Sequence, residues 1–165
     1  MPIASRTSKA TGRHRDAVTL LKSDHQQVKA WFAQFTKATD QVRQGTLARD
    51  ICHALRVHTT LEEEIFYPAF LESTGNKAVH HEAEVEHQAA ERLIAEIEDS
   101  TPADDFFTAR VNVLGELIKH HVREEEKPAG LFAKARKAGM DLKGLGAQLA
   151  ERKSQLEAER REEAA

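Results

Sequence analysis

The chain has 165 residues, of which 31% are Asp, Glu, Lys or Arg and 5% are aromatic, and its formal net charge is −3 at pH 7. This length predicts one domain with a substantial core, and the abundance of Ala, Leu, Glu, Lys and Arg favours helix over sheet. The net charge gives no overall positive field that would recruit nucleic acid. Its single cysteine, Cys52, excludes an internal disulfide. No apolar run approaches about 18 residues, so we expect no membrane segment. The first residues also lack the hydrophobic core of a signal peptide, so we expect a cytoplasmic protein.

The N-terminal residues 1–15 contain four basic side chains and no acidic one, the first acid being Asp16. Ser, Thr and Gly separate these charges, and the segment has no clear amphipathic face. Such a composition cannot bury enough apolar surface to fold. It predicts a disordered basic tail rather than a targeting segment or a nucleic-acid arm.

Apolar residues spaced by threes and fours then predict four long helices. They are expected over about residues 16–40, 46–73, 76–99 and 103–125. Asp16 is a good N-cap for the first helix, and Gly75 is a typical residue to end the second. Pro68 should kink the last turn of the second helix, and Pro128 should interrupt the end of the fourth.

Four long helices joined by short loops predict an all-α fold, an up-down-up-down four-helix bundle over residues 16–138. The remaining segment, residues 139–165, is rich in charge and predicts one more helix over about residues 142–163. Its leucines are expected to dock this C-terminal helix weakly outside the core.

Two stretches of the predicted second and fourth helices share a pattern, a His and a Glu four residues apart with a further Glu directly after. The stretches are His58-Thr-Thr-Leu-Glu62-Glu63 and His121-Val-Arg-Glu-Glu125-Glu126. On a helix this spacing puts both side chains on one face, one turn apart. Imidazole and carboxylate together suit a metal such as iron, zinc or copper. Buried carboxylates without partners would cost several kcal/mol each, so the pattern predicts a metal site.

Each half of the chain also contributes one lone histidine ahead of this pattern. His25 precedes His58 by 33 residues, and His87 precedes His121 by 34. In each half the lone His directly follows an acidic residue. Two equivalent half-sites in a pseudo-two-fold bundle suggest two metals between the halves.

These ordered motifs resemble the hemerythrin-like HHE cation-binding family over about residues 16–138. The motifs are Asp24-His25, His58-x-x-x-Glu62-Glu63 with Phe66-Tyr67-Pro68, Glu86-His87, and His121-x-x-x-Glu125-Glu126. The resemblance implies a four-helix bundle around a non-haem di-iron centre, with two iron ions bridged by the two glutamates. The implied ligands are His25, His58, Glu62, His87, His121 and Glu125.

The chain resembles the bacterial hemerythrin-like branch more than the oxygen-carrying hemerythrins. It departs from the oxygen carriers at two positions. Those carriers have a further His one turn before the third-helix ligand, where this chain has Ala83. They also bridge with an Asp five residues after the fourth-helix His, where this chain has Glu125 after four. We therefore expect the reduced protein to oxidise in air rather than to hold a long-lived oxygen adduct.

Six ligands leave room in the coordination of two irons, and two side chains are alternatives for completing it. Glu84 lies three residues before His87, on nearly the same face, and Tyr67 is the only tyrosine. Glu63 and Glu126 are expected to be solvated helix charges, or to orient a ligand histidine from behind.

Two classes of function remain open. One is a non-catalytic di-iron protein that interacts with oxygen, peroxide, nitric oxide or iron, and the other is a di-iron enzyme that decomposes peroxide or oxidises ferrous iron. A ferritin-like oxidase is disfavoured, since it requires two Glu-x-x-His pairs and this chain has only Glu84-x-x-His87. Zinc is a lesser alternative metal. We assign no catalytic residue, no organic cofactor and no oligomeric state, and the expected partner is a small molecule.

Overall fold

A computed structural model of the protein describes residues 15–165. The predicted basic tail, apart from its last residue, lies outside this range. The described residues form helices and turns without any strand, which confirms the all-α prediction. No helix among them is long and apolar enough to cross a membrane.

The first two helices are α1 (Ala17–Lys37) and α2 (Gln41–Leu61). Asp16 caps α1 as predicted, by accepting a hydrogen bond from the backbone N–H of Thr19 at 2.9 Å. The second helix begins five residues earlier than predicted, and Gly45 lies inside it. Asp40 is the reason, because its side chain accepts from the backbone N–H of Arg43 and caps α2 at that point.

After α2 the rod continues without a break through a π-helix, η1 (Glu62–Phe66), into α3 (Tyr67–Thr74). Pro68 lies in the first turn of α3, a position where a helix tolerates a residue without a backbone N–H. Gly75 then ends the rod in the left-handed conformation, at φ 63°. The disturbance predicted for the last turn is thus a π turn placed before the proline.

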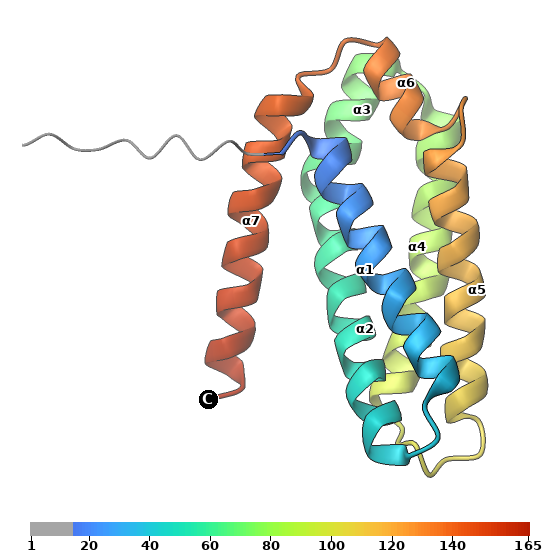
Figure 1. The fold of residues 1–165 in the computed structure, drawn as a ribbon. Coiled ribbons are helices and arrows are strands. Elements are labelled where there is room, and N and C mark those ends of the chain that lie inside the picture. Colours follow the sequence, from blue (N-terminus) through green and yellow to red (C-terminus); the bar gives the residue numbers. More distant parts are fainter. Residues whose placement is uncertain (1–14) are drawn as a thin grey trace, which may run out of the picture.

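The second half contains α4 (Lys77–Glu98), α5 (Phe107–Glu126), α6 (Leu131–Lys137) and α7 (Leu142–Glu163). The fourth long helix begins four residues later than predicted, because residues 102–106 form turns in which Asp104 accepts from the N–H of Thr101. Figure 1 shows α1, α2, α4 and α5 side by side, with α3 and α6 at the upper end.

The core of the bundle consists of two apolar clusters. The upper cluster, toward α3 and α6 in Figure 1, includes Leu21, Leu61 and Phe66, and the lower cluster includes Val28 and Leu55. Along α1 and along α4, a histidine lies between the last residue of the upper cluster and the first residue of the lower one. The two clusters are therefore separated by a belt of polar side chains.

The C-terminal helix α7 packs against α1, α2 and η1, outside the four long helices. Leu149 is fully buried and Leu145 nearly so. A Cβ on Gly146 would lie 2.1 Å from the carbonyl oxygen of Arg15, so only glycine permits this close approach to the start of α1.

Candidate metal centre

Six polar side chains are buried in the belt between the two apolar clusters. They are His25, His58, Glu62, His87, His121 and Glu125. None is more than 6% exposed. Helices α1 and α4 each contribute one histidine, and the α2–η1 rod and α5 each contribute one histidine and one glutamate. The structure therefore brings every predicted ligand together from four directions.

The first half-site is built around His25 and His58, whose Nε2 atoms lie 3.1 Å apart. The Nε2 of His58 lies 3.1 Å from Oε1 of Glu62, and the Nε2 of His25 lies 3.3 Å from Oε2 of Glu125. One donor atom from each of the four residues falls within 4.8 Å of the others. Two imidazole nitrogens and two carboxylate oxygens thus converge on one point.

The second half-site is built around His87 and His121, whose Nε2 atoms lie 3.3 Å apart. Here the partners are the other two carboxylate oxygens. Oε2 of Glu62 lies 3.2 Å from Nε2 of His87, and Oε1 of Glu125 lies 3.5 Å from Nε2 of His121. Each glutamate therefore directs one oxygen to each half-site.

The outer nitrogen, Nδ1, of every one of these histidines faces a second carboxylate. The pairs are His25 with Glu126 at 2.8 Å, His58 with Asp24 at 3.4 Å, His87 with Glu63 at 2.9 Å and His121 with Glu86 at 2.5 Å. A carboxylate at Nδ1 favours a proton there and leaves Nε2 free to bind a metal. Glu63 and Glu126 thus contact the outer nitrogens of His87 and His25, which fits one of their two predicted alternatives. Asp24 and Glu86 were not predicted in this role, although the acid before each lone histidine was a visible signal.

The donor set fits a cation in both half-sites. Of the buried side-chain atoms in residues 15–165, Oε1 of Glu62 and Oε2 of Glu125 have no hydrogen-bond partner, and both point into the first half-site. A buried carboxylate oxygen without a partner is costly. A metal bound to these oxygens and to the facing Nε2 atoms would remove that cost. Nitrogen and carboxylate donors together suit iron or zinc.

The charges of the metal-free site are coupled. Burial opposes protonation of His58, but the carboxylates of Glu62 and Asp24 outweigh it and raise the pKa of His58 to about 10. Burial also acts against the ionised form of Glu62, yet His58 and the rings of the second half-site hold its pKa well below the usual range. Without metal, His58 is therefore an imidazolium paired with carboxylates, and metal must displace its proton to bind.

Tyr67 reaches the second half-site because of the π turn. Its backbone N–H bonds to the carbonyl of Glu62, five residues earlier, so the two side chains lie on nearly the same face. The Tyr67 hydroxyl donates to Oε2 of Glu62 at 3.0 Å and to Oε1 of Glu125 at 2.9 Å, and lies 3.2 Å from Nε2 of His87. Burial and the two carboxylates raise the pKa of Tyr67 well above its usual value, so the phenol keeps its proton and acts as a hydrogen-bond donor.

The other alternative for completing the coordination, Glu84, does not reach the centre. Its side chain is 48% exposed and lies 3.7 Å from Nδ1 of His80. Position 83, where the oxygen carriers have a further histidine, holds a buried alanine. Tyr67, and not Glu84, therefore lies where it could add a donor.

The first half-site has an aromatic ring without a hydroxyl in the corresponding place. Phe132 of α6 stacks on His25, with ring centroids 5.9 Å apart and planes at 20°. Tyr67 packs on His87 in a similar way, at 5.4 Å and 30°. The two half-sites are alike in their inner donors and differ in this covering ring.

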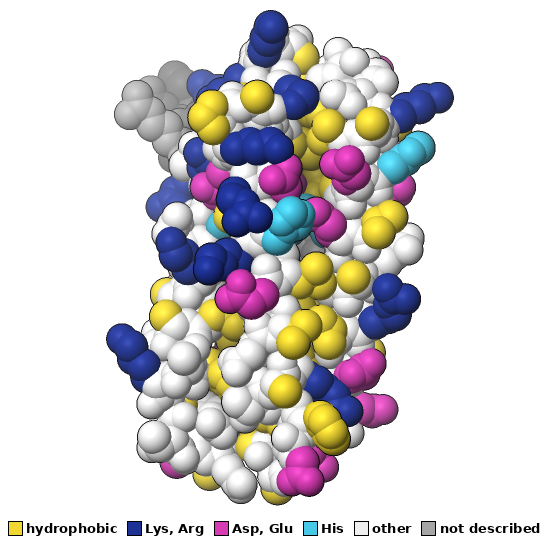
Figure 2. Space-filling view, turned by 90° about the vertical axis from the view of Figure 1, so that its right-hand side faces the viewer, with side chains coloured by type: hydrophobic (Ala, Val, Ile, Leu, Met, Phe, Trp, Pro, Cys, Tyr) yellow, Lys and Arg dark blue, Asp and Glu magenta, His cyan; other side chains and the backbone are white. Residues whose placement is uncertain are grey.

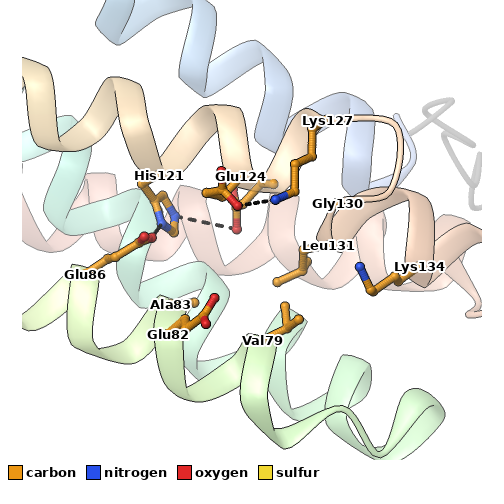
Figure 3. Close-up of a pocket in the computed structure, with 11 residues that line it drawn as sticks. Val79, Glu82, Ala83, Glu86, His121, Glu124, Lys127, Gly130, Leu131 and Lys134 are labelled. Carbon is orange, nitrogen blue, oxygen red and sulfur yellow. Dashed lines mark hydrogen bonds and ion pairs between the residues drawn. The ribbon is translucent and has the colours of Figure 1, made fainter.

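A cleft of about 80 Å³ between α4, α5 and α6 leads to the second half-site. Figure 3 shows His121 and Ala83 at its inner end, and Glu82, Glu124, Lys127 and Lys134 around it. The ion pair between Lys127 and Glu124 borders the cleft. Figure 2 shows Lys and Arg side chains gathered over the upper part of the face that carries α5 and α6. The cleft is therefore polar and leads inward from a charged surface.

A second cavity, of about 20 Å³, lies on the side of the lower cluster. All four histidines of the site contribute to its wall, and the remaining wall is largely apolar: Val28, Leu55, Ile118 and Val122. A cavity of about this size holds one water molecule or a molecule little larger. Both spaces beside the centre thus fit small molecules only.

Four helices that enclose a buried cluster of histidine and glutamate define a cation-binding helical protein. The sequence of residues 16–132 matches the family model of the hemerythrin HHE cation binding domain. The chain therefore belongs to this family. The resemblance read from the motifs is thereby confirmed.

Two relatives are similar to this chain. A protein named DNA nickase from Nostoc sp. is 28% identical over 117 residues, which are 71% of this chain and 32% of that protein. This chain thus spans about a third of the relative's length. A crystal structure of a hemerythrin HHE cation binding domain-containing protein from Mycobacterium kansasii superposes with a TM-score of 0.72 at 22% identity, covering 88% of this chain and 89% of that one. This likeness shows that the two share a fold.

Proposed function

We propose that the protein is a non-haem di-iron protein whose centre reacts with a small oxidant, namely oxygen, peroxide or nitric oxide. The observation that carries the proposal is the placement of Glu62 and Glu125, each of which directs one oxygen to each pair of histidines. A carboxylate placed in this way is suited to bridge two ions. The four long helices alternate in direction along the chain in Figure 1, which supports an up-down-up-down bundle as the frame.

The inner residues would hold two irons in unequal surroundings. His25 and His58 would bind one, His87 and His121 the other, with both glutamates shared. Two ferrous ions held there would supply two electrons, which together with two protons reduce one peroxide molecule to two water molecules. Tyr67 holds a proton between the two bridging carboxylates, on the side of the second half-site. It can give that proton to an oxygen atom that becomes more basic as it is reduced.

The cleft that leads to the second half-site favours reaction with a small molecule over stable storage of oxygen. Ala83 leaves the inner end of the cleft without the histidine that the oxygen carriers have, and the cleft is bordered by charged residues. A peroxide molecule both donates and accepts hydrogen bonds, so a polar cleft suits it. This supports the enzymatic alternative, decomposition of peroxide. The nicking activity in the name of the Nostoc relative is not part of the proposal, because this chain spans about a third of that protein.

The proposal is tested by loading the metal-free protein anaerobically with ferrous iron and counting the bound metal. Two irons per chain are expected. The loaded protein is then mixed with oxygen or peroxide in a stopped-flow spectrometer. Rapid oxidation without a persistent oxygen adduct supports a reactive centre. A single iron at saturation would refute the di-iron site, and an adduct that bleaches reversibly on removal of oxygen would show a carrier.

A further inference from the structure

Helix α7 makes one polar contact that leads directly to the metal centre. Lys153 of α7 lies with its Nζ 2.5 Å from Oδ1 of Asp24. The other oxygen of Asp24, Oδ2, faces Nδ1 of His58. Asp24 is only 13% exposed, so it is confined between these two partners. A helix that follows the residues matched by the family model, 16–132, therefore touches the carboxylate behind a ligand histidine.

The contact between Asp24 and His58 is the longest of the four outer contacts. It measures 3.4 Å, and the other three lie between 2.5 and 2.9 Å. Asp24 is also the one outer carboxylate of the four that is bonded to a lysine. An ammonium group attracts the carboxylate and withdraws its charge from His58, which accounts for the longer contact.

The equivalent carboxylate of the second half-site has a different second partner. Glu86 faces His121 with one oxygen and His120 with the other, at 3.1 Å. His120 is a half-exposed residue of α5, so this contact stays within the bundle. In the first half-site the second partner comes from α7 and carries a permanent charge.

Lys153 can leave Asp24 without disruption of the buried leucines of α7. The two residues line a cleft of about 190 Å³ between α7, α1 and α2, which also includes Trp31. Leu145 and Leu149, which bury the helix, lie at least a full turn nearer the start of α7. Beyond Lys153, the half-buried Leu156 packs against the upper cluster, and most of the other residues are charged.

We propose that α7 is part of the metal centre, and that Lys153 acts as a positioning residue that weakens the hold of Asp24 on His58. This inference rests on the proposed metal site. A carboxylate bonded to Nδ1 makes an imidazole a stronger metal ligand. With Lys153 in place, the first half-site binds its metal less tightly than it otherwise would. Displacement of the end of α7 strengthens that half-site and leaves the second unchanged.

The test compares the release of iron from the parent protein and three variants into a coloured chelator under anaerobic conditions. Lys153→Met keeps the stem and removes the charge, and we expect it to slow release from one of the two positions by ~3–10-fold, less than the ~10–100-fold typical of a direct outer partner. Lys153→Arg should restore the original rate. Lys143→Met is the matched control, because Lys143 is an exposed lysine at the start of α7, and its release rate should equal that of the parent.

A double variant isolates the path. In an Asp24→Asn background, Lys153→Met should no longer alter the release rate. An unchanged or faster rate in Lys153→Met alone, or an effect that persists in the Asp24→Asn background, would overturn the inference. Metal counting precedes each run, and zinc serves as a redox-inactive second probe. A parent protein that binds no metal would refute the proposed function, whereas a loaded protein with insensitive release would refute only the role of α7.

Discussion

The two half-sites are built from the same inner parts and covered by different ones. His25 and His58 in the first correspond to His87 and His121 in the second, and each glutamate lies close to histidines of both. The outer carboxylates correspond in the same way, Asp24 to Glu86 and Glu126 to Glu63. Over this repeated frame, the second half-site has the hydroxyl of Tyr67, while the first has the ring of Phe132. The repeated part suits metal binding, and the unequal part gives each position its own chemistry.

The largest expected effect comes from removal of a carboxylate that the half-sites share. Glu62→Ala or Glu125→Ala takes one donor from each position, so we expect at least one of the two metals to be lost. Glu63→Ala and Glu126→Ala are matched controls, since each touches only the outer nitrogen of one histidine. These should keep both metals with ~10–100-fold lower affinity, as measured by metal counting and titration. Equal losses from Glu62→Ala and Glu63→Ala would contradict the division into inner and outer carboxylates.

Removal of the metal should have the next largest effect, on global stability. Metal binds the folded state and should raise its stability by about 4 kcal/mol when its free concentration is about a thousand times Kd. Melting curves with and without a chelator measure the difference. The same comparison on Glu62→Ala is the control and should show a much smaller shift. Coincident curves for the parent protein would show that these residues form a solvated seam.

Tyr67→Phe makes the covering ring of the second half-site resemble that of the first. We expect the variant to keep two metals and to react with peroxide ~10–100-fold more slowly, because a positioned proton donor is lost. Phe132→Leu, which removes a ring without a hydroxyl, is the comparison and should change the rate much less. Loss of a visible charge-transfer band in Tyr67→Phe would further show that the phenol binds the iron directly. An unchanged rate would remove Tyr67 from the reaction.

The smallest expected effect is the pH dependence of the metal-free protein. The folded-state pKa of His58, about 10, lies above its ordinary value of 6.5. The protonated form therefore stabilises the folded state fully below pH 6.5, and this contribution is lost as the pH rises from 6.5 to 10. Urea unfolding should show the free energy of unfolding falling across this window. His58→Gln should flatten the dependence, and a rise in stability with pH would contradict it.

Much of the site was legible in the sequence because helices convert spacing into direction. His58 and Glu62 are one turn apart, so their shared face follows from the number of residues between them. Contacts between side chains of different helices cannot be read from spacing in this way. The partners of Asp24 and Glu86 are known only once the helices are packed. The acids beside the lone histidines each serve the histidine of a neighbouring helix, which spacing alone does not reveal.

The features that were not predicted depend on local irregularity or on tertiary contact. In a regular α-helix the side chains of Tyr67 and Glu62 would lie on different faces, and the π turn brings them onto nearly the same face. Gly45 indicated a helix boundary, but the cap at Asp40 outweighs it. The contact from Lys153 to Asp24 joins residues 129 apart, and no local pattern connects them.

The division of the core into two clusters has a consequence for how the molecule opens. The upper and lower clusters meet across the polar belt, so the residues that would bind metal also join two otherwise separate apolar units. Cooperative units that share few apolar contacts can open independently. Loss of metal is therefore expected to uncouple them, and amide hydrogens around Ile51 and around Phe70 should then exchange at different rates. Restoring the metal should make the two exchange rates equal. Metal occupancy would then be measurable from amide exchange in parts of the helices far from the centre.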